Sequence, residues 1–207
     1  MERFTMRVIA GKMKGRLIPF DNRSFNSAET TSQKLKKAAF SMMGEWLEGL
    51  RFLDLFACSG QMGFEACSRG ANVVMVEENA VRFAFIRDLT REWSCGGSVR
   101  AVRGDAMKLL ACDDFRNCPP FDVIYIDPPY DEHFQGEPLS VAAIAAASVV
   151  LGEDGVVLVQ HPDALEMPRT SGPLILRKTR RYGKSAISCY EWPDEYPDLN
   201  GDSGEQP

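Results

Sequence analysis

Asp127, Pro128, Pro129 and Tyr130 form a tetrapeptide that directly follows the apolar run 123–126. Proline lacks a backbone N–H group and fixes φ, and the residue before it is driven into an extended conformation. The carboxylate is therefore held rigidly where the run ends, which in an open α/β sheet is the edge that binds ligands. A carboxylate beside an aromatic ring suits a planar substrate with an amino group. We therefore interpret the tetrapeptide as a catalytic motif rather than a turn that merely ends a strand.

A second candidate site lies in the loop after the apolar run 52–56. A strand, a short loop of small residues and the start of a helix are typical of a nucleotide-type cradle, whose backbone approaches the ligand closely. Such loops also serve ordinary packing between a sheet and a helix. The cofactor contacts expected here are Asp54, Phe56, Ala57, Cys58, Ser59, Gly60 and Gly63.

Further acidic residues follow the predicted strands that come next along the chain. Glu77 closes the second strand, where a carboxylate can accept hydrogen bonds from ribose hydroxyl groups. Asp105, next to Ala106, follows the third strand and is placed to meet an adenine amino group. Asp54 could receive an ammonium group. Each acid alone is as often a helix cap or a surface charge, but together with Asp127 they mark four successive strands and indicate a cofactor site.

The sequence of the loop distinguishes between two classes of cofactor-binding enzyme. A dinucleotide dehydrogenase favours G-x-G-x-x-G, whereas this loop reads C-x-G-x-x-G and the fourth strand carries Asp-Pro-Pro-Tyr. An enzyme that methylates amino groups accounts for both features, and a dehydrogenase accounts only for the first. The pattern resembles that of class I S-adenosylmethionine methyltransferases, so S-adenosylmethionine is the expected cofactor.

Strands that alternate with helices are predicted to position these residues. Alternation implies right-handed βαβ units and a mostly parallel, doubly wound α/β sheet. The last two strands are joined without a helix and should form an antiparallel hairpin. Strands are predicted at 52–56, 72–77, 98–103, 121–126, 155–160, 173–179 and 185–191, and helices at 61–69, 80–93, 105–112 and 139–150.

The two ends of the chain carry opposite charge. Residues 1–40 hold nine Lys/Arg against three acids, whereas residues 193–207 hold five acids and no Lys/Arg. A basic hairpin is predicted over 7–18, and apolar spacing over 31–48 predicts a helix that packs on the core. The basic arm is a candidate polyanion contact, although a solvated face is about as consistent with the charge alone. The acidic end is expected to be disordered, which leaves one domain over 1–192.

Composition argues against several classes of protein. No apolar run approaches the roughly 20 residues of a membrane span, and the amino terminus lacks the apolar segment of a signal peptide. The six cysteines contain no C-x-x-C pair and only two histidines are present, which argues against a metal site or a disulfide scaffold. We expect a cytoplasmic protein without a metal or membrane partner. Since no apolar heptad or stripe stands out, a monomer is expected.

With these residues assembled, the chain resembles the RsmD family, which methylates the exocyclic N2 of a guanine in small-subunit (16S) ribosomal RNA. The Asp-Pro-Pro-Tyr motif marks amino-methylases broadly, whereas the amino-terminal Gly…Gly-Arg hairpin narrows the resemblance to this family. It covers residues 7–192. The matching segments are 7–11, 15–16, 54–60, 63–66, 68–71, Glu77, 105–106, 127–130, 181–183 and Tyr190.

The resemblance implies a Rossmann-like sheet of seven strands with the last one antiparallel, and an assembled or precursor 30S subunit as the substrate. Cys58 stands where the family usually has the first glycine of Phe-Ala-Gly-Ser-Gly, and a Cβ there should crowd the cofactor or strain φ. Glu29 stands where the family usually has the arginine of Arg-Pro-Thr. The candidate RNA contacts are Arg7, Lys12, Lys14 and Arg16 on the hairpin and Arg180, Arg181 and Lys184 between the last strands.

Three other functions share part of this pattern. A DNA adenine or cytosine amino-methylase would normally need a target-recognition domain, for which 207 residues leave no room. A protein-glutamine methylase typically has asparagine where this chain has Asp127. A non-catalytic ribosome-assembly factor could keep the fold and have lost cofactor affinity through Cys58.

Overall fold

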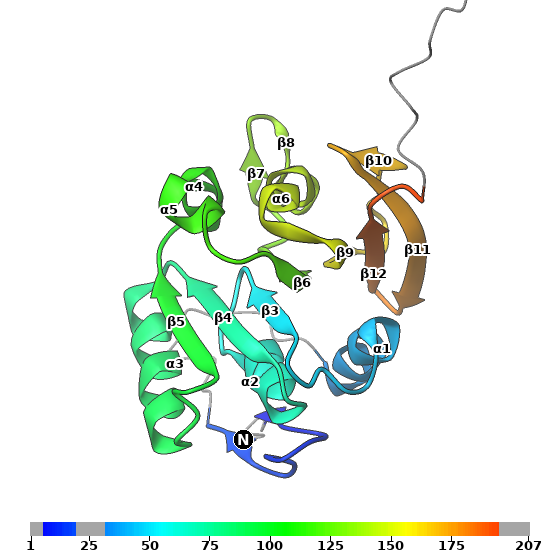
Figure 1. Cartoon of the computed structure of the whole chain (residues 1–207). Coiled ribbons are helices and arrows are strands. Elements are labelled where there is room, and N and C mark those ends of the chain that lie inside the picture. Colours follow the sequence, from blue (N-terminus) through cyan, green and yellow to red (C-terminus); the bar gives the residue numbers. More distant parts are fainter. Residues whose placement is uncertain (1–5, 20–31, 195–207) are drawn as a thin grey trace, which may run out of the picture.

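The structure is a computed structural model that describes residues 6–19 and 32–194 (Figure 1). The expectations for Glu29 and for nearly all of the acidic end lie outside the described residues. The strands of the main sheet are β3 (Arg51–Asp54), β4 (Asn72–Glu77), β5 (Val99–Arg103), β6 (Phe121–Ile126), β9 (Leu151–Pro162), β10 (Thr170–Ser171), β11 (Leu174–Tyr182) and β12 (Ser185–Glu191). The helices are α1 (Gln33–Met43), α2 (Gln61–Ser68), α3 (Ala80–Glu92), α4 (Ala106–Ala111), α5 (Asp113–Arg116) and α6 (Leu139–Ala147).

The main sheet has the order β10-β11-β12-β9-β6-β3-β4-β5. The strands β9, β6, β3, β4 and β5 are parallel to one another, and β12 runs antiparallel to both of its neighbours, β9 and β11. The expected sheet with an antiparallel last strand is therefore confirmed, as is the hairpin of β11 and β12. The two-residue strand β10 adds an eighth strand at one edge.

Alternation along each strand divides the core into two layers, as a doubly wound sheet requires. Phe52 faces a cluster that includes residues of α1, α2 and the amino-terminal hairpin. Its neighbour Leu53 faces the opposite cluster, which includes residues of α4 and α6. Figure 1 shows α4, α5 and α6 on the upper side of the sheet and α1 and α2 on the lower side.

The amino-terminal hairpin consists of β1 (Met6–Arg7) and β2 (Leu17–Ile18) and is docked onto the end of α2. Buried Glu65 of α2 accepts hydrogen bonds from the backbone N–H groups of Ile9 (2.8 Å) and Ala10 (3.0 Å). It also pairs with Lys36 of α1 (3.1 Å) and with Arg69 (3.0 Å), and all three side chains are buried. Because a buried charge is tolerated only when it is paired, Glu65 ties the hairpin, α1 and α2 together.

Several boundaries differ from those predicted. Strand β9 is longer than the predicted 155–160, and the predicted helix 139–150 ends as α6 before a 3₁₀ turn, η1 (Ser148–Val150). The predicted helix 105–112 is α4, with the short α5 after it. A small hairpin of β7 (His133–Phe134) and β8 (Glu137–Pro138) follows the Asp-Pro-Pro-Tyr motif and was not predicted.

Candidate active site

A cavity of about 880 Å³ lies at the carboxyl ends of β3, β4, β6 and β9. Its walls also include the start of α1, the β7–β8 hairpin and the turn between β11 and β12. This is the edge at which open α/β sheets bind ligands. All four predicted catalytic residues line the cavity, and so does every predicted cofactor residue except Gly60 and Gly63.

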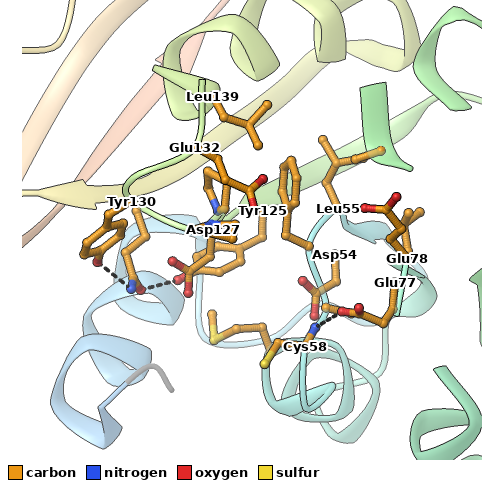
Figure 2. Close-up of a pocket in the computed structure, with 18 of the residues that line it drawn as sticks. Asp54, Leu55, Cys58, Glu77, Glu78, Tyr125, Asp127, Tyr130, Glu132 and Leu139 are labelled. Carbon is orange, nitrogen blue, oxygen red and sulfur yellow. Dashed lines mark hydrogen bonds between the residues drawn. The ribbon is translucent and has the colours of Figure 1, made fainter. Parts of the chain in front are cut away.

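Glu77 holds the cofactor loop in place from the end of β4. Its Oε2 accepts a hydrogen bond from the backbone N–H of Cys58 (2.8 Å), drawn in Figure 2. Its Oε1 accepts hydrogen bonds from the backbone N–H of Asn79 (2.8 Å) and from Nε of Arg82 (2.9 Å). A carboxylate oxygen can accept two hydrogen bonds, so Oε2 keeps capacity for a ligand. Arg82 was not predicted, because its charge alone does not distinguish it from the other arginines of α3.

Asp54 is the last residue of β3 and is buried at the base of the cavity. Its Oδ2 accepts a hydrogen bond from the backbone N–H of Gly63 (3.0 Å). Burial raises the pKa of Asp54 to about 7; the Gly63 bond opposes this rise, and the nearby charges of Asp127 and Glu77 add to it. Because its charged form is poorly solvated, a cationic ligand group beside this carboxylate would be strongly favoured.

Cys58 adopts a left-handed backbone conformation with φ +49°. The expectation that a side chain at this position strains φ is therefore confirmed. Burial raises the pKa of the thiol to about 12; Arg82 opposes the rise, and Glu77 is the largest of the carboxylates that add to it. The Cys58 side chain is thus a neutral thiol at pH 7.

Gly60 and Gly63 serve the packing of α2 rather than the cavity wall. Gly60 has φ +74°, and a Cβ there would lie 2.8 Å from the ring of Phe64. A Cβ on Gly63 would lie 2.6 Å from the Sδ atom of Met75 in β4. The absence of these two side chains lets α2 start tightly against the sheet, which in turn positions the cofactor loop.

Asp105 caps α4 and lines the cavity at the same time. Its Oδ1 accepts hydrogen bonds from the backbone N–H groups of Met107 (2.9 Å) and Lys108 (3.1 Å). Such a cap fixes the carboxylate at the helix start. Ala106 follows it as a buried residue of the wall.

The Asp-Pro-Pro-Tyr motif leaves β6 and turns at once, since the backbone N–H of Glu132 donates to the carbonyl of Pro129 (3.3 Å). Asp127 is half-buried, and Pro128 is buried. Figure 2 shows Asp127 and Tyr130 on one side of the cavity and Cys58 and Glu77 on the other. A substrate group held at the motif would therefore face a ligand held in the loop.

The Tyr130 hydroxyl is fixed by two neighbours. Nε2 of Gln160 donates to it (3.0 Å), and it donates to Oγ of Ser185 (3.2 Å). Oε1 of Gln160 in turn accepts from the hydroxyl of Tyr125 (2.8 Å). Neither Gln160 nor Ser185 was predicted. The available signal for Gln160 was a polar amide directly after the apolar run 156–159.

The predicted contacts between the last strands lie beside the cavity. Lys184 is exposed in the β11–β12 turn, whose flanking residues Tyr182 and Ser185 line the cavity. Arg180 and Arg181 are consecutive in β11, so their side chains leave opposite faces of the sheet. Arg181 pairs with Asp163 (3.1 Å).

The tip of the amino-terminal hairpin, which carries the predicted contacts Lys12 and Lys14, lies away from the cavity. The tip of the hairpin meets the last turn of α2, because the backbone N–H of Lys12 donates to the carbonyl of Ser68 (2.7 Å). Helix α2 starts at the cavity and is eight residues long, so the tip is about 12 Å away from that edge. The exposed cations of the hairpin are Arg7, Lys12, Lys14 and Arg16.

Two of these hairpin cations already have partners in the fold. Nζ of Lys12 lies 3.5 Å from Glu48. The guanidinium of Arg16 lies over the ring of Trp93, 5.4 Å from its centroid. Arg7 is held through its backbone carbonyl, which accepts a hydrogen bond from Nζ of Lys36 (2.6 Å). The Arg7 side chain is exposed.

Residues 6–19 and 32–194 contain no cluster of three or more His, Cys, Asp or Glu side chains suited to a metal ion. Within the same ranges, no helix is long and apolar enough to cross a membrane.

Comparisons with known proteins place these observations in a family. The chain is 30% identical over 187 residues to "Putative rRNA methyltransferase YlbH" of Bacillus subtilis. This alignment covers 90% of this chain and 98% of the relative. It is 23% identical to "Ribosomal RNA small subunit methyltransferase D" of Escherichia coli K12, over 90% of this chain and 89% of that one. A solved structure of a hypothetical protein from Thermus thermophilus superposes with a TM-score of 0.74 at 26% identity, covering 89% of this chain and 98% of that chain.

The fold and the relatives agree with the expected resemblance to RsmD. The family model described as "Conserved hypothetical protein 95" matches residues 6–191, which include the hairpin, the cofactor loop and the Asp-Pro-Pro-Tyr motif. The chain therefore belongs to the conserved hypothetical protein 95 family of RsmD-like methyltransferases.

Proposed function

We propose that the protein transfers a methyl group from S-adenosylmethionine to the exocyclic N2 of a guanine in small-subunit ribosomal RNA, within an assembled or precursor 30S particle. The observation that carries the proposal is that Asp127 and Tyr130 face the cofactor loop and Glu77 across one cavity (Figure 2). The names of the relatives in B. subtilis and E. coli support ribosomal RNA as the substrate.

The residues of the cavity fit S-adenosylmethionine. Asp54 is a buried carboxylate suited to an ammonium group, and Glu77 retains an acceptor for ribose hydroxyls. Asp105 is held at the wall by its cap and can accept from an adenine amino group. When bound, the cofactor supplies a methyl group on a positively charged sulfur.

Asp127 acts on the target amine. The N2 lone pair of guanine is delocalised into the ring, which makes the amine a weak nucleophile. The carboxylate of Asp127 and the backbone carbonyl of Pro128 accept hydrogen bonds from the two N–H groups, which favours a pyramidal nitrogen. The same acceptors stabilise the positive charge that develops on nitrogen as the methyl group arrives. The surplus proton leaves to solvent afterwards, so Asp127 need not be a strong base.

Tyr130 stacks on the target base. A guanine amine in a helix is buried by pairing, so the base must leave its stack to enter the cavity. A ring fixed by its hydroxyl provides a surface for the extruded base, and alignment of the two reacting groups supplies much of the rate. Lys184 is suited to hold an RNA phosphate near this opening, and Arg180 and Arg181 could contact phosphates from the two faces of β11.

The decisive experiment uses small subunits from cells that lack this protein, labelled S-adenosylmethionine and mapping of the labelled nucleotide. We expect label on one guanine, and label on adenine or on protein would overturn the assignment. Short naked RNA should be a poor substrate, because specificity must come from the shape of the ribosomal site.

The change Asp127→Ala should lower transfer at least about 100-fold, because it removes a charged acceptor from the transition state. Calorimetry should show nearly unchanged binding of S-adenosylmethionine. Asp114→Ala, which removes an exposed acid of α5, is the matched control and should keep the rate. Undetectable cofactor binding by the wild-type protein would instead indicate a non-catalytic assembly factor.

A further inference from the structure

Four polar side chains form a continuous row of hydrogen bonds beside the Asp-Pro-Pro-Tyr motif. The hydroxyl of Tyr125 donates to Oε1 of Gln160 (2.8 Å), and Nε2 of Gln160 donates to the hydroxyl of Tyr130 (3.0 Å). The hydroxyl of Tyr130 then donates to Oγ of Ser185 (3.2 Å). The row joins β6, β9, the motif and the start of β12, and Gln160 is the member that bridges the two tyrosines.

The sheet itself does not need a polar residue at position 160. Tyr125 is opposite Leu158 in the pairing of β6 with β9, so Gln160 continues the same face two residues further on. Leu158 is fully buried, and Gln160 is only 6% exposed. Burying an amide costs free energy unless its hydrogen bonds are made, whereas an apolar residue would satisfy packing alone. The amide at this position therefore points to a role beyond the core.

The position of the Tyr130 ring depends on this bridge. Two prolines restrict the backbone before Tyr130, but they do not restrict the rotation of its side chain. Hydrogen bonds on both sides of the hydroxyl supply that restriction. A displacement of about 1 Å in a group that aligns the substrate can cost about 100-fold in rate.

We propose that Gln160 is a positioning residue for methyl transfer: its amide fixes the Tyr130 ring in the orientation on which the extruded base stacks. The inference rests on the proposed function, because it assigns Gln160 to the same site. Gln160 acts through Tyr130 and does not itself touch the reacting atoms.

Two substitutions separate hydrogen bonding from packing. Gln160→Leu keeps the approximate volume and removes both bonds to the tyrosines. Gln160→Glu has the same shape, and because burial favours the neutral form of a carboxyl group, it can still accept from Tyr125 and donate to Tyr130. We expect Gln160→Leu to lower kcat about 10- to 100-fold with little change in cofactor Kd, and Gln160→Glu to recover most of the loss.

Ser188→Ala is the matched control. Ser188 is buried in the same sheet, and its Oγ bonds to Nε2 of His161 (2.9 Å) and to Oγ1 of Thr179 (2.8 Å). The change removes a comparable buried polar group without touching Tyr130. It should lower the stability of the fold while leaving kcat unchanged.

A spectroscopic readout decides the inference without the reaction. The chain has five tyrosines, so ¹³Cζ-tyrosine labelling gives few NMR signals, and Tyr130→Phe assigns the relevant one. Without RNA, the Tyr130 signal should shift or broaden in Gln160→Leu and return towards wild type in Gln160→Glu. An unchanged signal in Gln160→Leu would overturn the inference, as would a shifted signal with an unchanged kcat. If wild-type protein methylates no RNA, the proposed function fails, while the signal still decides whether Gln160 sets the ring.

Discussion

Cys58 is held at φ +49°, a conformation that costs a residue with a side chain about 1–2 kcal/mol relative to the right-handed region. Glycine avoids this cost but loses roughly 0.5–1 kcal/mol through its greater freedom in the unfolded chain. The thiol, half-buried and neutral, contributes packing rather than charge. The strain at cysteine and the extra freedom of glycine in the unfolded chain therefore partly cancel, so the two residues should give similar free energies of unfolding.

The first prediction compares two substitutions at this residue. Cys58→Ala keeps the strained Cβ and loses the thiol, whereas Cys58→Gly relieves the strain. We expect Cys58→Gly to be more stable than Cys58→Ala by about 0.5–1 kcal/mol, measured by urea unfolding. The reverse order would show that backbone strain does not govern the position.

The second prediction concerns pH and Asp54. Its pKa is raised from an ordinary value of 3.8 to about 7, so the unfolded chain releases this proton at lower pH than the folded protein. The stabilising contribution of the protonated group is thus complete below pH 3.8 and is lost as pH rises to about 7. Asp54→Asn cannot ionise, so its stability relative to wild type should grow between pH 3.8 and about 7 and stay level above that.

Urea unfolding of both proteins at several pH values measures this difference. A difference that stays constant across that range would contradict the raised pKa. Calorimetry on the same samples should show weaker binding of S-adenosylmethionine by Asp54→Asn, since the charged partner of the ammonium group is gone.

Single residues also mark the limit of sequence-based prediction. Asp127 and Glu77 could be predicted because carboxylates at the ends of apolar runs are conspicuous. The bond from Glu77 to the backbone of Cys58, and the bridge through Gln160, join residues distant in sequence. Only the pairing of β6 with β9 brings Gln160 next to Tyr125.

Elements with a clear hydrophobic period were predicted within a few residues, and β4, β6 and β12 have the bounds that the pattern indicated. The β7–β8 hairpin was missed because its strands have two residues each and carry no period. Its turn has positive φ at Gln135 and Gly136, a conformation that favours tight hairpins. Gly136 was the available signal.

The third prediction tests how α1 is held to the fold. Buried Lys36 pairs with Glu65 and donates to the carbonyl of Arg7, although burial lowers the pKa of its amine. Lys36→Met would leave Glu65 with one fewer charged partner in the interior. Breaking a buried pair in this way typically costs about 3–5 kcal/mol.

Denaturant unfolding measures the loss, and the next residue provides the control. Lys37 is exposed on the same helix, so Lys37→Met should change stability by less than about 0.5 kcal/mol. Equal effects of the two substitutions would show that the buried pair of Lys36 and Glu65 does not stabilise the fold.

At the scale of the whole molecule, the predicted RNA contacts are divided between the β11–β12 hairpin and the amino-terminal hairpin. The position of the β11–β12 turn at the cavity could be predicted from the alternation of strands and helices, because parallel strands have their carboxyl ends at one edge of the sheet. The docking of the hairpin tip on α2 could not be foreseen, since it depends on the tertiary contacts of Glu65 and Ser68.

The fourth prediction asks which edge meets RNA. Lys184→Ala and Lys14→Ala should each lower affinity for small subunits and reduce the slope of log K against log salt by about 1, if each lysine neutralises one phosphate. Arg116→Ala, at an exposed cation of α5, should leave the slope unchanged. A wild-type slope for Lys14→Ala would remove the hairpin tip from the RNA-contact surface.

Glu65 also sets a limit on how far the chain can be shortened. Truncation just before Gly11 would retain every described residue that lines the cavity, yet it would delete the backbone donors of Ile9 and Ala10 and the carbonyl that binds Lys36. Their loss would leave buried Glu65 of α2 and buried Lys36 of α1 short of hydrogen-bond partners. The first turn of α2 shapes the cofactor loop. The residues from Gly11 onwards are thus not expected to form a stable methyltransferase on their own, and a minimal version of this protein must keep the amino-terminal strand β1.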